Sequence, residues 1–178
     1  MNKRRNFLFC LLAMLVFTAF STQAQTTVHI VRHAEKETKD PANKDPALSL
    51  DGQDRAKDLA ALLLPQRILA VYSTPYKRTM QTAEPTAYGH GVKTQTYDPS
   101  DPAALVASVL RNHKGGSVLI VGHSNTVLEL VEAFGIKRPI PELKDDDYNY
   151  LFSITVNGNS TSMVMSQYGQ LKRTSVPK

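Results

Sequence analysis

The stretch Val28-His29-Ile30-Val31-Arg32-His33-Ala34-Glu35-Lys36 decides how the rest of the chain is interpreted. It begins as a short β-branched and apolar run, which predicts a buried strand. The run ends in two adjacent basic residues, Arg32 and His33, and a polar loop follows. In α/β proteins ligands bind beyond the carboxyl ends of the strands. This strand therefore places a cation and an imidazole where a ligand is expected.

The first 24 residues are expected to lie outside the fold. A positively charged start, Met1–Arg5, precedes an almost unbroken apolar run, and Ser21–Ala24 supplies small residues for cleavage. This order is typical of a secretory signal peptide. The apolar run of about 15 residues is short for a membrane span, which needs ~20. We predict cleavage near Ala24, a periplasmic or secreted location, no stable membrane insertion, and a single domain over residues 25–178.

Loss of the signal peptide changes the chemistry that the chain can use. It removes Cys10, the only cysteine, so neither disulfides nor thiol chemistry are expected in the mature protein. The full chain carries a net charge of +5, and removal of Lys3, Arg4 and Arg5 leaves +2. That charge is too small for a polybasic nucleic-acid binder. Any electropositive function must therefore be local.

Strands and helices alternate along the remaining chain. Besides the first strand, buried strands are expected at 68–72 and 117–121, an alternating strand at 92–97, and helices at 53–64, 76–83, 102–112 and 126–134. Residues 150–156 and 161–167 flank Asn157-Gly158, a typical hairpin turn. This alternation predicts a three-layer α/β/α sandwich with a mostly parallel sheet and a C-terminal β-hairpin.

Three of these strand ends carry matching chemistry. The first supplies Arg32 and His33, the second is followed by Arg78, and the fourth by His123. Because the carboxyl ends of parallel strands meet at one edge of a sheet, we expect these four residues to lie together. The N-termini of the helices that follow add partial positive charge. Arginine binds two phosphate oxygens at once, so the edge suits a dianion such as phosphate.

The motifs on these strand ends resemble those of the histidine phosphatase (phosphoglycerate mutase-like) superfamily. They are Val31-Arg32-His33-Ala34-Glu35-Lys36, Ser73-Thr74-Pro75-Tyr76-Lys77-Arg78-Thr79-Met80-Gln81-Thr82-Ala83 and Val121-Gly122-His123-Ser124, in the family order. The helix start Leu48-Ser49-x-x-Gly52 is similar to that family as well. The short interval between Arg78 and Gly122 leaves no room for a large cap domain, as in the small phosphohistidine phosphatases.

The resemblance implies a phosphatase that works through a phosphohistidine. His33 would be the nucleophile, and Arg32, Arg78 and His123 would bind the phosphoryl oxygens. No metal and no cofactor are expected, because protein cations supply the positive charge that phosphoryl transfer needs. An alkoxide leaving group also needs a proton, usually from a carboxylic acid. Asp98, at the end of the third strand, is our first choice for this acid, and Glu35 and Glu84 remain open.

Three alternatives are compatible with parts of the pattern. An α/β-hydrolase elbow at Ser124 is disfavoured because no histidine follows it in the chain. A metal site built from His29, His33 and His123 lacks any HExxH or cysteine motif. A catalytically weak phosphate- or phosphoester-binding protein would keep the pocket without turnover. The expected substrate is a small phosphomonoester or a phosphorylated envelope sugar, and the oligomeric state is open.

Overall fold

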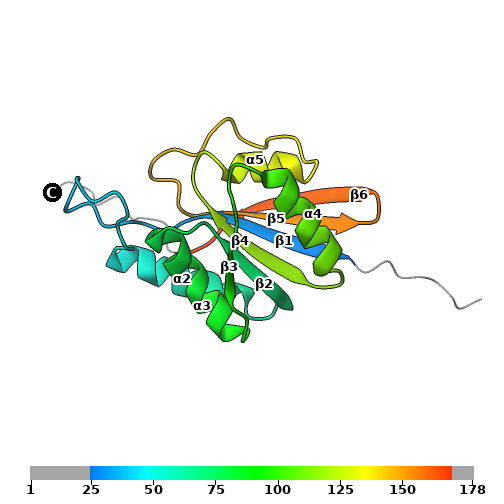
Figure 1. Ribbon diagram of the computed structural model, residues 1–178, viewed down its shortest axis with the longest axis horizontal. Helices are drawn as coiled ribbons and strands as arrows, with labels where there is room; N and C mark the ends of the chain where they lie inside the picture. The colour runs from blue at the N-terminus through cyan, green and yellow to red at the C-terminus, as the bar shows by residue number, and fades with distance from the viewer. Residues whose placement is uncertain (1–24, 170–178) are drawn as a thin grey trace, which may run out of the picture.

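A six-stranded sheet forms the centre of the computed structural model, which describes residues 25–169 (Figure 1). Its strands are β1 (Thr26–Arg32), β2 (Ile68–Ser73), β3 (Thr94–Thr96), β4 (Ser117–Gly122), β5 (Tyr150–Asn157) and β6 (Ser160–Gln167). The strand order is β3-β2-β4-β1-β5-β6. The first four strands run parallel, and β5 and β6 add an antiparallel hairpin. The predicted α/β fold with a C-terminal hairpin is confirmed.

Helices cover both faces of this sheet. Within the described residues these are α2 (Leu50–Leu63), α3 (Lys77–Gly89), α4 (Pro102–Asn112) and α5 (Val127–Ala133). Figure 1 shows α2 and α3 on one face and α4 and α5 on the other. Adjacent residues of β1 follow the same division, because successive strand side chains point to opposite faces: Ile30 packs in the core under α4 and α5, and Val31 in the core under α2 and α3.

The third strand is shorter than predicted. Only Thr94–Thr96 pair with β2, whereas the alternating pattern predicted a strand over residues 92–97. Val92 instead donates its backbone N–H to Ala87 O, which ties it to the end of α3. This hydrogen bond to the end of α3 keeps Val92 out of the strand, so the strand is shorter than predicted.

Helix α3 is longer than predicted. The prediction ended the helix at Ala83, but the helix continues to Gly89 with Pro85 inside it. Proline removes one helical hydrogen bond and is costly in a helix interior. Ala83 and Ala87, on either side of Pro85, are both buried against the sheet. We attribute the extension to this packing.

The start of α2 fastens the loop that follows β1. Ser49 caps the helix by accepting a hydrogen bond from Gly52 N at 3.2 Å. Its own N–H donates to Glu35 O at 2.9 Å. A Cβ atom on Gly52 would lie 2.1 Å from that same carbonyl oxygen. Glycine is therefore needed for the close approach that holds the segment next to His33.

The predicted signal peptide, residues 1–24, lies outside the described residues. Between residues 25 and 169, no helix combines the length and the apolar character that crossing a bilayer requires.

Candidate active site

Three parallel strands bring the predicted site residues to one edge of the sheet. In the register of the sheet Arg32 lies opposite Gly122, and Ser73 lies opposite Val121. The backbone N–H of His33 donates to Gly122 O at 2.9 Å, so the two strand ends stay joined beyond the ladder. The rings of His33 and His123 are 5.4 Å apart in an edge-on arrangement.

His33 is buried and held in one tautomer. Its side chain Nδ1 lies 2.8 Å from Ala34 O, and since a carbonyl can only accept, Nδ1 carries the proton. Burial lowers the pKa of His33 to about 3; the bond to Ala34 opposes this, and the nearby Arg32 and Arg78 add to it. The ring is therefore neutral near pH 7, with its lone pair on Nε2.

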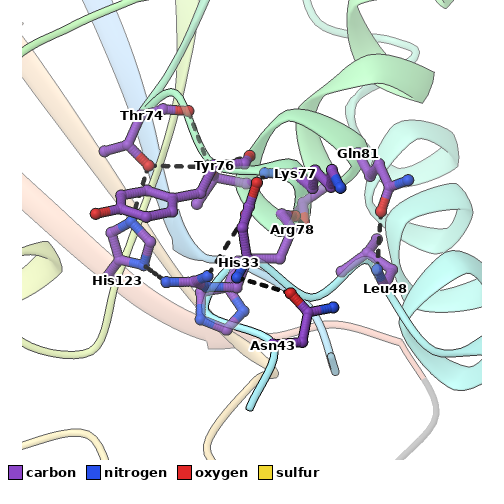
Figure 2. Close-up of polar contacts among 12 residues, drawn as sticks. His33, Asn43, Leu48, Thr74, Tyr76, Lys77, Arg78, Gln81 and His123 are labelled. Carbon is purple, nitrogen blue, oxygen red and sulfur yellow. Dashed lines mark hydrogen bonds and ion pairs between the residues drawn. The ribbon is translucent and has the colours of Figure 1, made fainter. Parts of the chain in front are cut away.

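His123 is oriented by Arg78 on one side and Thr74 on the other. Arg78 Nη2 donates to His123 Nδ1 at 3.5 Å, and His123 Nε2 lies 2.8 Å from Thr74 Oγ1. Because the guanidinium only donates, Nδ1 is the acceptor and Nε2 carries the proton. Figure 2 shows these three side chains in series beside His33. Burial, followed by the charges of Arg78 and Arg32, lowers the pKa of His123 to about 4.

Thr74 and Thr79 anchor this series in the backbone. The two hydroxyl oxygens are 2.9 Å apart, and Thr79 Oγ1 also lies 2.9 Å from the carbonyl oxygens of Thr74 and Tyr76. Both threonines are fully buried. Since Thr79 can donate to a carbonyl, Thr74 can donate to Thr79 and accept from His123. The orientation of His123 is thus fixed by rigid, buried groups.

Arg32 is held by the irregular segment between α5 and β5. Its Nη1 donates to Lys144 O at 2.7 Å, and its guanidinium lies 4.3 Å from the centre of the Tyr148 ring. Tyr148 also lies 5.9 Å, ring to ring, from His33. Arg32 Nε is buried without a hydrogen-bond partner among the described residues. A buried donor of this kind is costly unless it binds something, and an anionic oxygen is the matching acceptor.

A second tyrosine borders the other side of the site. The Tyr76 ring lies 4.6 Å from the Arg78 guanidinium and 5.1 Å from the His123 ring. It is 41% exposed, so it reaches from the site to solvent. Each arginine therefore has an aromatic face against it, Tyr148 for Arg32 and Tyr76 for Arg78.

The structure places the first-choice acid, Asp98, in an exposed turn. Its Oδ1 accepts hydrogen bonds from Ser100 N and Ser100 Oγ, and these bonds lower the pKa of Asp98. It lines a hollow of about 380 Å³ between β3 and α4, and none of the four proposed phosphate-site residues lines that hollow. A lowered pKa favours the carboxylate, whereas a proton donor needs the acid. The role of Asp98 stays a prediction, and this geometry does not favour it.

The two other candidate acids lie in contrasting places. Glu35 is buried and forms an ion pair with Arg55, whose Nη2 lies 2.7 Å from Glu35 Oε1. Arg55 Nε adds bonds of 3.0 and 2.8 Å to the two carboxylate oxygens. This pairing holds Glu35 as a carboxylate. Glu84 is exposed on α3.

Four residues around the site were missed from the sequence. Thr74 lies within a quoted motif directly after β2, so its place at a strand end was a usable signal. Tyr76 lies in the same motif but carries no pattern of its own. Asp45, whose Oδ1 lies 3.9 Å from Arg78 Nη1, and Tyr148 come from irregular loops, where neither periodicity nor spacing indicates which side chain points inward.

Potential metal ligands do not gather in the part of the chain that the structure describes. Between residues 25 and 169, no three His, Cys, Asp or Glu side chains are arranged to hold a metal ion. His29, part of the metal alternative, instead contacts Ser153 Oγ at 2.9 Å through its Nδ1.

Comparison with known proteins supports the resemblance inferred from the motifs. Residues 28–99 match the family model of the histidine phosphatase superfamily (branch 1). A search of curated proteins finds no match. The match to the family model includes Arg32, His33 and Arg78.

Solved structures share the fold over nearly their whole length. The protein histidine phosphatase SixA complexed with tungstate has a TM-score of 0.65 at 18% identity, covering 79% of this chain and 96% of its own. A mycobacterial glucosyl-3-phosphoglycerate phosphatase gives 0.62 at 12% identity, covering 81% and 98%. An Escherichia coli protein described as an alpha-ribazole-5'-P phosphatase gives 0.63 at 12% identity, covering 80% and 96%. The expected resemblance to the histidine phosphatase superfamily is confirmed by the family model, and SixA structures are among the proteins that share the fold.

Proposed function

The chain has the fold of the histidine phosphatase superfamily and matches its family model over residues 28–99, and on this premise we propose that it is a phosphomonoester phosphatase acting through His33. The observation that carries the proposal is His33 itself. A buried, neutral imidazole with its Nε2 lone pair available lies beside two arginines. A neutral imidazole is a competent nucleophile near neutral pH.

The first step is attack of His33 Nε2 on phosphorus. The Nδ1–H bond to Ala34 O stabilises the positive charge that develops on the ring as the P–N bond forms. The bond between phosphorus and the leaving oxygen breaks, and its electron pair stays on that oxygen. Water then attacks the phosphohistidine, and the P–N pair returns to Nε2 with release of phosphate.

The arginines and His123 hold the phosphoryl oxygens during both steps. Arg32 Nε is a buried donor that lacks an acceptor among the described residues, so a phosphoryl oxygen satisfies it. Arg78 faces the same group from α3. Burial and the two arginines lower the pKa of His123, and the negative charge of a bound phosphate opposes both effects. It therefore favours a proton on His123 Nδ1, while Nε2–H still donates to Thr74 Oγ1. Positioning and positive charge are the main requirements of phosphoryl transfer.

We further propose that the reaction requires no metal ion and that the substrate is a small phosphomonoester. The names of two structural neighbours, phosphatases for glucosyl-3-phosphoglycerate and alpha-ribazole-5'-P, support small phosphoesters. The name of SixA supports a phosphohistidine substrate as the competing choice. The signal-like sequence at residues 1–24 favours a periplasmic or secreted location, and there a phosphorylated envelope sugar is the expected substrate.

The test is hydrolysis of 4-nitrophenyl phosphate by the purified protein with EDTA present. His33→Ala should abolish turnover, and Arg78→Ala should reduce kcat/KM by roughly 10²-fold or more, as for other groups that stabilise transition-state charge. Arg67→Ala is the matched control, since Arg67 is an exposed arginine at the opposite end of β2. Acid-labile labelling of the wild-type protein by a ³²P-phosphoester, absent in His33→Ala, would identify the phosphohistidine.

The outcomes separate the proposal from its alternative. EDTA-resistant turnover that depends on His33 supports the phosphatase. A wild-type protein that binds phosphate through Arg32 and Arg78 but hydrolyses no phosphoester would instead be the catalytically weak binding protein considered from the sequence. Turnover that EDTA abolishes would contradict the metal-independent mechanism.

A further inference from the structure

The loop between β1 and α2 brings a carboxylate to the phosphate site. Asp45 Oδ1 accepts a hydrogen bond of 2.9 Å from Lys77 N, the first residue of α3, and lies 3.9 Å from Arg78 Nη1. Asn43 Oδ1 in turn accepts from Asp45 N at 3.0 Å, which fixes the turn. The α3 N-cap, Tyr76, makes no side-chain capping bond, so Asp45 provides that cap from another part of the chain.

The position of Asp45 combines access and proximity. Its side chain is 39% exposed, whereas the Arg78 side chain is 15% exposed. Asp45 therefore lies where Arg78 meets solvent. A leaving group must depart through the solvent-facing side of the site, because β1, β4 and the helices close the inner side.

The other carboxylates considered are engaged elsewhere. Glu35 is buried against Arg55, and Asp98 is bonded to Ser100 in a turn that borders a different hollow. Asp45 is the carboxylate that the described residues place in an ion pair with a proposed phosphate-binding side chain.

We propose that Asp45 is the general acid that protonates the leaving oxygen, a role that rests on the proposed phosphatase function. Asp45 lies 3.9 Å from Arg78 Nη1 and accepts the N–H of Lys77. The charged and titratable groups around it are Arg78, the start of α3 with Lys77, and the neutral rings of His33 and His123 behind Arg78. When a phosphate dianion takes the charge of Arg78, Asp45 faces a like charge, which favours its protonated form. Substrate binding thus favours the protonated form of Asp45 that the reaction needs.

The proton balance of the cycle follows from this assignment. As His33 Nε2 bonds to phosphorus, the P–O bond breaks and the leaving oxygen takes the proton of Asp45. The resulting carboxylate accepts a proton from the water that attacks the phosphohistidine. The cycle releases an alcohol and phosphate and leaves Asp45 protonated and His33 neutral.

The experiment compares Asp45→Asn with Asp98→Asn on two substrates, 4-nitrophenyl phosphate and glycerol phosphate. Asparagine retains the Oδ1 acceptor for Lys77 N, so the cap of α3 is preserved. Nitrophenolate needs no proton to leave, whereas an alkoxide does. We expect Asp45→Asn to lower kcat for glycerol phosphate by about 10²–10⁴-fold, the usual contribution of general acid catalysis, and to lower kcat for the aryl ester less than about tenfold. In Asp45→Asn, the fall of kcat/KM at high pH should disappear with glycerol phosphate and remain unchanged with 4-nitrophenyl phosphate.

Other results would overturn the assignment. If Asp45→Asn lost kcat/KM equally on both substrates, and the loss came from a higher KM, Asp45 would be a positioning residue for Arg78. A leaving-group-dependent loss in Asp98→Asn, with Asp45→Asn unaffected, would restore Asp98 as the acid. A wild-type protein inert on both esters would remove the phosphatase proposal together with its acid, whereas full wild-type activity of Asp45→Asn on both removes the acid alone.

Discussion

Replacement of Arg55 by methionine should destabilise the protein strongly, although Arg55 contributes nothing to the proposed chemistry. Arg55 lies on α2, and its guanidinium bonds both oxygens of Glu35 and, at 3.1 Å, the backbone oxygen of Tyr168. Both side chains of the pair are only 8% exposed. The variant keeps the carboxylate of Glu35 in this buried place and takes away its guanidinium partner.

The expected loss follows from that burial. Breaking a buried ion pair by removing one partner costs about 3–5 kcal/mol. For a domain of this size each kcal/mol shifts Tm by roughly 2–4 °C, so Tm should fall by about 6–20 °C. Lys57→Met is the matched control on the same helix. Lys57 pairs with Asp54 at 68% and 73% exposure, and such a pair contributes about 0–1 kcal/mol.

Urea unfolding followed by circular dichroism measures the difference. The double variant Glu35→Gln/Arg55→Met should recover most of the loss, because it carries no buried charge at this place. The reasoning is refuted if Arg55→Met costs no more than Lys57→Met, or if the double variant is as unstable as the single one. Either result would show that the charge of Glu35 is not the cause of instability in Arg55→Met.

Three further predictions concern other parts of the fold. Burial lowers the pKa of His29 from 6.5 to about 4, so the folded state binds its proton less readily than the unfolded chain. The stability that the neutral His29 contributes is therefore fully present above pH 6.5, and about 3 kcal/mol of it is lost as the pH falls towards 4. The urea midpoints at pH 7 and pH 4.5 should therefore differ less in a stable His29→Leu variant than in the wild-type protein. Thr74→Val should lower kcat/KM by roughly tenfold or more through misorientation of His123, with Thr74→Ser restoring it and both variants unfolding at similar urea concentrations. Gly52→Ala should cost about 1–3 kcal/mol or more, since its Cβ would meet Glu35 O at 2.1 Å; a thermal melt equal to that of wild type would contradict this.

The sheet and the central site residues were accessible from sequence for the same physical reason. Apolar runs of β-branched residues predict buried strands, and alternation with helices makes those strands parallel. Parallel strands then bring their carboxyl ends to one edge, so Arg32, His33 and His123 could be grouped from the sequence. The register of β1 with β4 shows this grouping.

The loops could not be assigned in the same way. Asp45 reaches Arg78 through turns that are set by local side-chain bonds, and Tyr148 reaches Arg32 because the Lys144 carbonyl is fixed by that arginine. Neither contact leaves a repeating pattern in the sequence. Asp98 illustrates the converse problem, because a place at a strand end does not determine where a short side chain finds its hydrogen bonds.

The pairing of β1 with β4 at the centre of the sheet determines when the site can form during synthesis and folding of the chain. Arg32 and Gly122 are register partners, yet about 90 residues separate them along the chain, and such distant contacts form late in folding. A nascent chain that ends before β4 has His33 but neither His123 nor the carbonyl of Gly122 that holds the His33 backbone. In such a chain the backbone of His33 lacks the bond to Gly122 and its ring lacks its neighbour His123. The arrangement on which the proposed reaction depends therefore forms only after β4 has been synthesised and has paired with β1.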